Sequence, residues 1–355
     1  MIYWTRDQSL KTTHIYMKNF KEAIQKSQKI LITSHINCDQ DGITSALGTK
    51  LIIEKNFEGK IVEANIDSAL QQNISFLKDF HKIQTKNLVE KIEEFKPDLL
   101  IFTDGQVAKR FCEDEDRLLK TIKDRNITTA LIDHHDSETT LQTDFRFNNW
   151  RSSCAEEIYH LFVKGMNLEI DRDIAEIILT GMVYDTGIFT YKNKYFRETA
   201  NTIADLLEYG VIIEDIINSK KQYTKMDLKI IGELSNNLEV KDNFCYTYIS
   251  DEFFNNEILD KKIPEDEFKR GRHIWMDLFI KNIKDCSWGF VIYQTYTKNK
   301  YKIAARSRQD KIAARNFAEN FGGGGHDQAA GFSLEAENIQ EALEKILEKK
   351  LKLKI

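Results

Sequence analysis

Residues 129–135 read Thr129-Ala130-Leu131-Ile132-Asp133-His134-His135, an apolar run that ends in one carboxylate and two imidazoles. These polar side chains are a poor choice for a hydrophobic core and a good choice for a metal site at the end of a buried strand. Three other segments follow the same pattern: Lys29–Ser34 leads into His35, Asn37, Asp39 and Asp41, Leu99–Thr103 into Asp104, and Ile174–Tyr184 into Asp185. Four such clusters at the ends of core elements predict one polynuclear metal centre.

Short apolar runs and amphipathic stretches alternate along the first half of the chain. The apolar runs are typical of buried parallel strands and lie at residues 29–34, 60–64, 98–103 and 128–132. The amphipathic stretches are typical of helices and lie at residues 43–55, 87–95 and 117–125. This alternation predicts an α/β fold with a doubly wound, mostly parallel sheet. Ligands bind beyond the carboxyl ends of the strands in such sheets, and His35, Asp104 and Asp133 fall at that edge.

The pattern changes in the second half of the chain. Helices are predicted at residues 153–163, 171–184, 197–209 and 212–220. A helix at 226–236 then precedes strands at 244–249, 287–296 and 301–306, a helix at 309–320 and a terminal helix within 339–355. We therefore expect two domains, residues 1–220 and a smaller C-terminal α/β domain at residues 221–355, with the active site in the cleft between them.

The composition excludes several classes of protein. The chain has 355 residues, of which 41% are hydrophobic and 30% are charged, and it contains no run of 18 apolar residues that could span a membrane. The first 20 residues lack the apolar core of a signal peptide. The five cysteines form no Cys-x-x-Cys pair, so neither a disulfide framework nor a zinc knuckle is indicated. We expect a cytoplasmic protein with no membrane partner.

The net charge of −5 conceals a basic segment. Between Lys269 and Arg315 there are 12 lysines or arginines and 3 aspartates, a local balance of +9. The candidate metal ligands upstream are mostly carboxylates. An acidic, cation-loaded half and a basic half suit an anionic substrate held between them, although any one lysine is more simply explained as a solvated surface residue.

The clustered polar side chains have the chemistry of a binuclear metal centre. The ligands expected from them are His35, Asp39, Asp41, Asp104, His134 and Asp185. Mixed nitrogen and oxygen ligands suit Mn²⁺, with Mg²⁺, Co²⁺ or Fe²⁺ as alternatives. Four carboxylates balance two divalent ions, which at a separation of roughly 3.5–4 Å can clamp a phosphoryl group for in-line attack. Gly42 is expected to permit a tight turn before a helix that starts near Ile43.

Each of these residues has an ordinary explanation when it is taken alone. A single aspartate at a strand end usually caps a helix or a turn, and a single histidine there is more often hydrogen-bonded than metal-bound. Their joint occurrence at the ends of one predicted sheet favours a shared site.

A second cluster lies in the basic segment. It consists of Gly322-Gly323-Gly324-Gly325-His326, with Arg306-Ser307-Arg308 upstream. Glycines let the backbone approach an anion and present N–H groups to it, and arginine forks bind phosphate in a bidentate manner. A lone glycine cluster is as often a flexible turn, but the neighbouring histidine and arginines favour an anion site.

Taken together, these motifs resemble the signatures of the DHH phosphoesterase superfamily. The segments His35-x-Asn37-x-Asp39-x-Asp41, Asp104, Asp133-His134-His135 and Gly181–Gly187 are similar to its four motifs, and Gly322–His326 with Ala329-Ala330-Gly331 is similar to its associated C-terminal domain. The resemblance covers roughly residues 29–335. It implies a metal-binding catalytic domain over residues 1–220 and a substrate-binding domain over residues 221–355.

The resemblance also implies a role for each matching residue. One ion would be held by His35, Asp39 and Asp104, and the other by Asp41, Asp104, His134 and Asp185, with Asp104 as the bridge. Asp133 would orient an imidazole, and His135 would stabilise the phosphoryl oxygens or protonate the leaving oxygen, so Asp104, Asp133 and His135 form the catalytic set. The terminal phosphate or ribose of the substrate would be held by Arg306, Ser307, Arg308, Gly324, Gly325 and His326.

The leading hypothesis is a two-metal-ion phosphodiesterase that hydrolyses short oligonucleotides or linear dinucleotides, such as pApA and pGpG, to mononucleotides. As in related enzymes, cleavage would start at the 5′ end. Short single-stranded RNA or DNA is the expected partner, because the basic surface is confined to a small domain. The oligomeric state stays open, a homodimer included.

Four other functions are compatible with the same motifs. The site could remove the 3′-phosphate of 3′-phosphoadenosine 5′-phosphate. It could also act on single-stranded DNA as RecJ-type exonucleases do, because the segment Asp41–Ser45 is similar to their motif. An inorganic pyrophosphatase is disfavoured by the glycine-rich motif, because those enzymes carry a different second domain. A non-catalytic nucleotide-binding sensor is disfavoured by the complete set of ligands.

Overall fold

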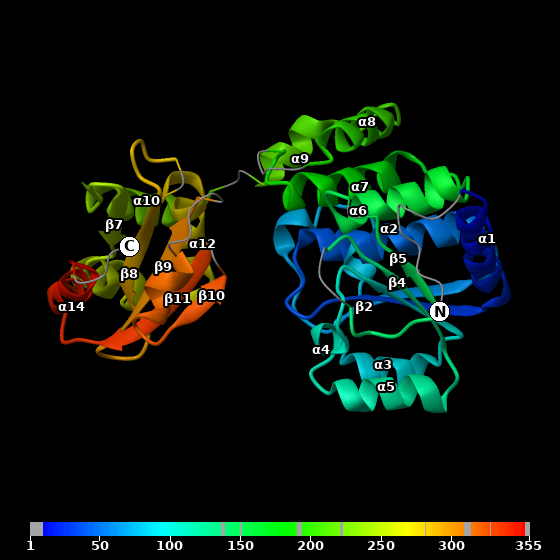
Figure 1. Ribbon diagram of the computed structural model, residues 1–355, viewed down its shortest axis with the longest axis horizontal. Helices are drawn as coiled ribbons and strands as arrows, with labels where there is room; N and C mark the ends of the chain where they lie inside the picture. The colour runs from blue at the N-terminus through cyan, green and yellow to red at the C-terminus, as the bar shows by residue number, and fades with distance from the viewer. Residues whose placement is uncertain are drawn as a thin grey trace. The chain divides into compact units, whose positions relative to one another are not determined.

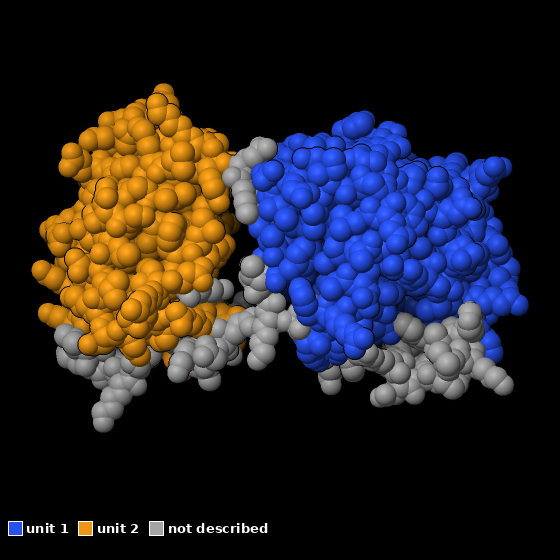
Figure 2. Space-filling view, turned by 90° about the horizontal axis from the view of Figure 1, so that it is seen from above, with its two compact units in different colours: residues 1–221 blue, residues 222–355 orange. Residues whose placement is uncertain are grey.

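The computed structural model describes residues 10–135, 139–149, 151–189, 194–220, 223–280, 282–308, 314–326 and 328–351. The chain forms two compact units, Met1–Lys221 and Gln222–Ile355, which Figure 2 shows in blue and orange.

A five-stranded sheet forms the centre of the first unit, and all of its strand pairs are parallel. The strand order is β2-β1-β3-β4-β5. The strands are β1 Lys29–Ser34, β2 Ile61–Ile66, β3 Leu99–Thr103, β4 Thr128–Ile132 and β5 Phe145–Phe147. The central strands are buried except at the first residues of β1 and β4, Lys29 and Thr128, because both faces of the sheet are covered, as the continuous apolar runs predict.

Helices cover both faces of this sheet (Figure 1). Alternate side chains of β1 point to opposite faces: Ile30 and Ile32 pack into the core formed with α1, α2, α6 and α7, whereas Leu31 packs into the core formed with α3, α4 and α5. The helices are α1 Leu10–Lys26, α2 Gln40–Asn56, α3 Leu88–Phe95, α4 Ala108–Phe111, α5 Glu115–Asp124, α6 Cys154–Ile158, α7 Arg172–Asp185, α8 Phe196–Leu207 and α9 Ile213–Lys220. Shorter helical turns lie at Gln72–Ile74, Phe80–Lys82 and Tyr159–Gly165.

The second unit has a six-stranded mixed sheet in the order β10-β11-β9-β8-β7-β6, in which only the β7–β8 pair is parallel among the described strands. The strands are β6 Glu239–Lys241, β7 Phe244–Tyr248, β8 Trp288–Gln294, β9 Lys300–Ser307, β10 Gly324–His326 and β11 Ala329–Glu335. Its helices are α10 Lys225–Asn236, α11 Asp251–Phe253, α12 Glu265–Trp275, α13 Ala314–Glu319 and α14 Ile339–Leu351, with π-helical turns at Phe254–Leu259 and Met276–Ile280. Two apolar cores, one on each face of the sheet, contain α13 with α14 and α10 with α12.

The predicted fold class is confirmed, since a parallel α/β unit precedes a second α/β unit with a mixed sheet. Several elements were not predicted, among them α1, α12, β5, and the pair β10 and β11. Residues 309–313 of the predicted 309–320 helix lie outside the described residues, and α13 covers Ala314–Glu319. No described helix is long and apolar enough to cross a membrane.

Candidate metal centre

Parallel register brings the predicted site segments to one edge of the first sheet. Ser34 at the end of β1 pairs with Thr103 at the end of β3, and Thr103 pairs with Ile132 at the end of β4. The next residue in each segment is polar: His35, Asp104 and Asp133. Their side chains are buried at this edge, where strand ends in doubly wound sheets form ligand sites.

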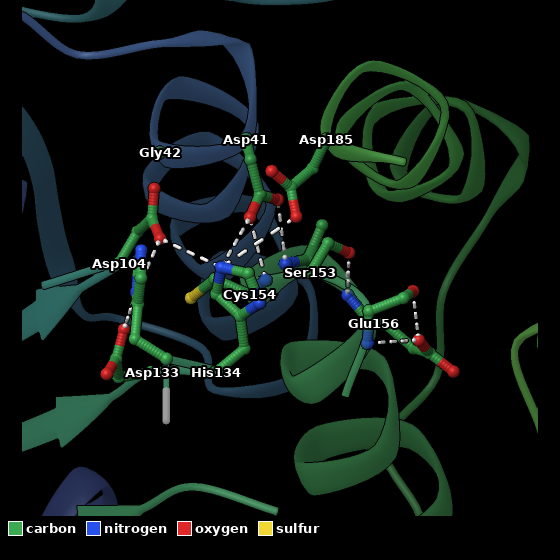
Figure 3. Close-up of polar contacts among 12 residues, drawn as sticks. Asp41, Gly42, Asp104, Asp133, His134, Ser153, Cys154, Glu156 and Asp185 are labelled. Atoms are coloured by element: carbon green, nitrogen blue, oxygen red, sulfur yellow. Dashed lines mark hydrogen bonds and ion pairs between the residues drawn. The ribbon is translucent and has the colours of Figure 1, made fainter. Parts of the chain in front are cut away.

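Asp104 contacts two histidines of this cluster, and Figure 3 shows it beside His134. Its Oδ2 atom is 3.4 Å from Nε2 of His35, and its Oδ1 atom is 3.5 Å from Nε2 of His134. The side chain is buried, and the backbone has a left-handed φ of 60°. One carboxylate therefore faces two imidazoles from different strands.

The donor atoms form three groups, in each of which all the atoms lie within 4.8 Å of one another. The groups are His35 with Asp39 and Asp104, Asp41 with His134 and Asp185, and Asp104 with His134 and His135. All six side chains predicted as ligands are thus brought together.

Asp39 and Asp41 enter the site from the start of α2. Asp39 caps this helix by accepting a hydrogen bond from the amide of Gly42 at 3.1 Å, and the same Oδ1 atom lies 3.9 Å from Nε2 of His35. Asp39 therefore caps α2 and also belongs to the cluster of donor atoms. Asn37 is exposed and adopts a left-handed φ of 56°.

The amino terminus of α6 holds Asp41 in place, a feature that sequence reasoning missed. The amide of Cys154 donates to Oδ2 of Asp41 at 2.7 Å, and the amide of Ala155 donates to Oδ1 at 3.0 Å (Figure 3). A helix amino terminus stabilises a carboxylate through its free N–H groups and its dipole. The capping sequence Ser153-x-x-Glu156 was the available signal, but it marks a helix start and does not identify what its amides bind.

Two glycines allow the backbone to approach these carboxylates. A Cβ atom on Gly42 would lie 2.5 Å from Oγ of Ser34 and 3.1 Å from Oδ2 of Asp104. A Cβ atom on Gly181 would lie 2.3 Å from Oγ1 of Thr44 and 2.9 Å from Oδ1 of Asp41. The explanation of Gly42 as part of a turn before the helix is wrong, because α2 begins at Gln40 and Gly42 lies within its first turn.

Asp133 and His135 form a pair beside the cluster. Oδ1 of the buried Asp133 lies 2.8 Å from Nδ1 of His135, while Asp104 Oδ1 lies 3.7 Å from the same nitrogen. Because Nδ1 is engaged by Asp133, this contact fixes the orientation of a half-exposed imidazole.

The electrostatics of the cluster favour a bound cation. Burial raises the pKa of Asp41 well above its usual value, and the charges of Asp104 and Asp185 raise it further. Burial also raises the pKa of Asp185 to about 6, against the opposing effect of His134. Burial alone would lower the pKa of His134, but the neighbouring carboxylates, Asp104 foremost, raise it well above its usual value. Like charges held this close need a counter-charge.

The residues present fit a divalent metal ion. Nε2 of His35 and Oδ1 of Asp104 are buried and lack hydrogen-bond partners, which leaves donor atoms that a metal would satisfy. The two nearby thiols, Cys38 and Cys154, are buried, and burial raises the pKa of each well above its usual value. The donor set therefore consists of carboxylate oxygens and imidazole nitrogens, which suits Mn²⁺, Mg²⁺ or Co²⁺.

The predicted substrate residues lie in the second unit. Arg306 on β9 and Gly324 on β10 line a cavity of about 420 Å³. Ser307 is buried and Nη2 of Arg308 donates to the carbonyl of Ile283 at 3.3 Å, and neither residue is among the described residues that line this cavity. Gly325 has a positive φ of 141° and accepts a hydrogen bond from Arg315. The side chain of His326 lies outside the described residues.

The glycine run serves strand packing as well as any ligand. A Cβ atom on Gly323 would lie 2.3 Å from the carbonyl oxygen of Gly331, and one on Gly325 would lie 2.6 Å from that of Ala329. A Cβ atom on Gly324, by contrast, would meet nothing within 4 Å. Gly323 and Gly325 are therefore required by the close approach of β11, whereas Gly324 faces open space.

Comparison with known proteins identifies the family. Residues 29–182 match the N-terminal domain of the DHH family, and residues 243–352 match the DHHA1 domain. The chain belongs to the DHH superfamily and carries a C-terminal DHHA1 domain, which confirms the resemblance found in the sequence.

Three relatives illustrate the range of similarity. The bifunctional oligoribonuclease and PAP phosphatase NrnA of Mycoplasma genitalium is 26% identical over 314 residues, covering 87% of this chain and 89% of the relative. A probable manganese-dependent inorganic pyrophosphatase of Archaeoglobus fulgidus is 27% identical, over 51% of this chain and 59% of the relative. The crystal structure of an exopolyphosphatase-related protein from Bacteroides fragilis has a TM-score of 0.74 at 24% identity, covering 95% of this chain and 96% of that one, and supports the same fold.

Proposed function

We propose that this protein is a metal-dependent phosphodiesterase that hydrolyses short oligonucleotides or linear dinucleotides to mononucleotides. The observation that carries the proposal is the cluster around Asp104, in which six carboxylate and imidazole side chains converge at the carboxyl edge of a parallel sheet. The similarity to an oligoribonuclease over almost the whole chain supports this substrate class. The five buried free thiols are compatible with a reducing cytoplasm.

Two divalent ions, Mn²⁺ foremost, are the proposed cofactors. His35, Asp39 and Asp104 would hold one ion, and Asp41, Asp104, His134 and Asp185 would hold the other. When bound, such ions supply activation of the attacking water and stabilisation of charge on the phosphoryl oxygens. The α6 amides position Asp41 for this purpose, and the neighbouring glycines keep the approach to the carboxylates open.

His135 is the proposed catalytic side chain that is not a ligand. With Nδ1 held by Asp133 at 2.8 Å, Nε2 is left to hydrogen-bond the phosphoryl oxygens or to give a proton to the leaving oxygen. Asp133 acts as a positioning residue, since its buried carboxylate accepts a hydrogen bond from Nδ1–H and holds the ring in place. The form of the ring that also donates from Nε2 is the imidazolium, which carries a proton on both nitrogens.

The second unit is proposed to hold the substrate, with cleavage from the 5′ end. Arg306 and Gly324 line its cavity, where an arginine fork and an unobstructed backbone can receive a phosphate. Ser307, Arg308, Gly325 and His326 remain proposed substrate residues on the resemblance alone.

A second candidate activity is removal of the 3′-phosphate from 3′-phosphoadenosine 5′-phosphate. The name of the Mycoplasma genitalium relative combines both activities, and hydrolysis of either substrate differs only in the leaving group. The similarity to the pyrophosphatase covers only about half of this chain, so it gives no comparable support for that activity.

The test is hydrolysis of a substrate panel by the full-length protein with Mn²⁺. The panel contains pApA, pGpG, single-stranded RNA and DNA of two to about twenty nucleotides, and 3′-phosphoadenosine 5′-phosphate. The lower limit is two nucleotides because this is the shortest length that contains an internucleotide phosphodiester. The longer strands are included because they engage extended basic grooves. Mononucleotide release that is fastest from the shortest chains is expected. Activity restricted to long single-stranded DNA would move the protein to the RecJ type, and binding without turnover would favour a sensor.

A further inference from the structure

A short connecting segment lies between β5 and α6, beside the metal cluster. It comprises residue 149 and residues 151–153, none of which belongs to a helix or a strand. The carbonyl oxygen of Arg151 lies 3.4 Å from Nδ1 of His134. Because a carbonyl oxygen only accepts hydrogen bonds, this contact places a proton on Nδ1 and leaves Nε2 as the nitrogen that can bind a cation.

The contacts of the connecting segment are confined to one of the two proposed ion sites. Nε2 of His134 lies 3.8 Å from Oδ2 of Asp41 and 3.8 Å from Oδ2 of Asp185. The α6 amides that bind Asp41 follow the segment directly (Figure 3). His35 and Asp39 belong to the other site, and among the described residues their polar partners do not include this segment. The segment therefore acts on the site formed by Asp41, His134 and Asp185.

Two neighbouring glutamates of α6 hold the connecting segment in place. Glu157 accepts hydrogen bonds from the backbone amide of Asn149, at 3.3 Å, and from its side-chain amide. Oε2 of the same glutamate lies 3.5 Å from Nε of Arg151. Glu156 accepts hydrogen bonds from the backbone amide of Ser152, at 3.0 Å, and from its hydroxyl. The position of the Arg151 carbonyl is thus set by carboxylates that lie one residue apart on a helix.

Glu157 is the carboxylate that is committed to this segment. Its side chain is 1% exposed, and among the described residues all of its hydrogen bonds and its ion pair go to Asn149 and Arg151. Glu156, by contrast, also accepts hydrogen bonds from α8. A buried ion pair is often no more stabilising than the uncharged groups that could replace it. The contacts of Glu157 are therefore better explained by the position that they give to Arg151 than by a gain in stability.

We infer that Glu157 is a positioning residue of the metal centre. Through the connecting segment it fixes the Arg151 carbonyl and hence the imidazole of His134, which strengthens binding of the ion held with Asp41 and Asp185. The inference rests on the proposed function, because it requires the metal centre, and it adds a difference between the two ion sites. Loss of this carboxylate weakens one Mn²⁺ site and leaves the other unchanged.

The test is titration of the full-length protein with Mn²⁺, followed by the electron paramagnetic resonance signal of the free ion. Wild-type protein is expected to bind both proposed ions. In Glu157→Gln, one ion is expected to bind about tenfold more weakly, an effect typical of residues that orient a metal ligand. The reason is that the Nε2 atom of glutamine donates and cannot accept the contacts that a carboxylate oxygen accepts. The affinity for the other ion is expected to change by less than about twofold.

Glu63→Gln is the matched control, because it removes another paired carboxylate of the same unit. Glu63 forms an ion pair with Lys91 and accepts a hydrogen bond from Gln84 at 3.1 Å, and neither partner belongs to the connecting segment. Both Mn²⁺ affinities are expected to equal those of wild-type protein in this variant.

Two further measurements separate positioning from folding. The free energy of unfolding of Glu157→Gln in urea is expected to equal or exceed that of wild type, because an amide is less costly to bury than a carboxylate. Arg151→Met is expected to weaken the same ion as Glu157→Gln does. The double variant is expected to be no weaker than Glu157→Gln alone, because both residues act through one contact.

Several outcomes overturn the inference: unchanged Mn²⁺ affinities in Glu157→Gln, equal weakening of both ions, effects that add in the double variant, or no Mn²⁺ binding by wild-type protein. Failure of the proposed function gives a different result. Selective weakening of one ion in a protein that does not hydrolyse pApA would refute the phosphodiesterase and leave the role of Glu157 intact. Hydrolysis of pApA together with equal Mn²⁺ affinities in wild type and Glu157→Gln would do the reverse.

Discussion

Asp104 has a left-handed backbone conformation at the point where the proposed ligands converge. Its φ of 60° is in the left-handed region, which costs a residue other than glycine on the order of 1 kcal/mol. The conformation follows directly after β3 and accompanies a carboxylate whose two oxygens face His35 and His134. Local strain at the point where ligands converge is typical of a functional site.

Replacement of His135 separates a catalytic role from a metal-binding role. His135→Gln is expected to lower kcat about 10²-fold, the usual contribution of a positioned acid, and to leave Mn²⁺ affinity unchanged because Nδ1 is engaged by Asp133. Asp133→Asn is expected to lower kcat less, since it acts through the imidazole. The measurements are steady-state kinetics and Mn²⁺ titration; a loss of metal affinity in His135→Gln would instead make this residue a ligand, as its group with Asp104 and His134 permits.

Three helices build the environment of Asp41. The residue lies in the first turn of α2, its oxygens accept hydrogen bonds from the start of α6, and Gly181 lets α7 pack closely against both. The position of this carboxylate is therefore set by helix packing as well as by the strand ends.

Gly181→Ala is expected to disturb this packing. The added methyl would overlap Thr44 and approach Asp41, so we expect a loss of about 1–3 kcal/mol in the free energy of unfolding, together with weaker Mn²⁺ binding. Gly48→Ala on α2 is the matched control, because its Cβ atom would lie 3.5 Å from the nearest atom, an ordinary contact. Urea unfolding and Mn²⁺ titration of both variants decide the matter, and equal behaviour of the two would contradict the packing argument.

The sequence predicts the elements whose pattern is strong and misses those set by tertiary contacts. β1, β3 and β4 were predicted because both faces of each strand are buried, and the polar residues after them were predicted because they interrupt those runs. The α6 amides carry no side-chain signature, and Gly42 and Gly181 are explained only by the atoms around them. β10 and the first half of β11 were missed because Gly324-Gly325 and Ala329-Ala330-Gly331 have no strand periodicity, and the alternation in the rest of β11, Phe332–Glu335, covers only four residues.

Across the whole molecule, each unit has its own apolar cores, and the core of the first unit contains buried acids. Glu156 accepts hydrogen bonds from Thr199 and Thr202 of α8, so this carboxylate joins α6 to α8. Glu157 accepts a hydrogen bond from Asn149 and lies 3.5 Å from Nε of Arg151. The stability of the chain should therefore depend on pH through these acids.

Glu157 is expected to make the free energy of unfolding depend on pH. Burial raises its pKa from 4.5 to about 7, so the folded protein binds more protons than the unfolded chain between these values, and stability falls as pH rises through the range. The whole difference corresponds to about 3 kcal/mol. We expect the free energy of unfolding of Glu157→Gln to rise relative to wild type by up to this amount between pH 4.5 and 7.5. The measurement is urea unfolding as a function of pH, with the exposed Glu58→Gln as control. A difference in free energy of unfolding between Glu157→Gln and wild type that does not vary with pH would contradict this prediction.

The most direct test of the account is hydrolysis of pApA with Mn²⁺ by wild-type protein and by Asp104→Asn. Wild-type protein is expected to release AMP, and the variant is expected to lose activity by about 10³-fold or more, because the carboxylate shared by both proposed ion sites is removed. Asp124→Asn, an exposed residue on α5, should retain full activity. Full Mn²⁺-dependent activity in Asp104→Asn would contradict the assignment of the metal centre.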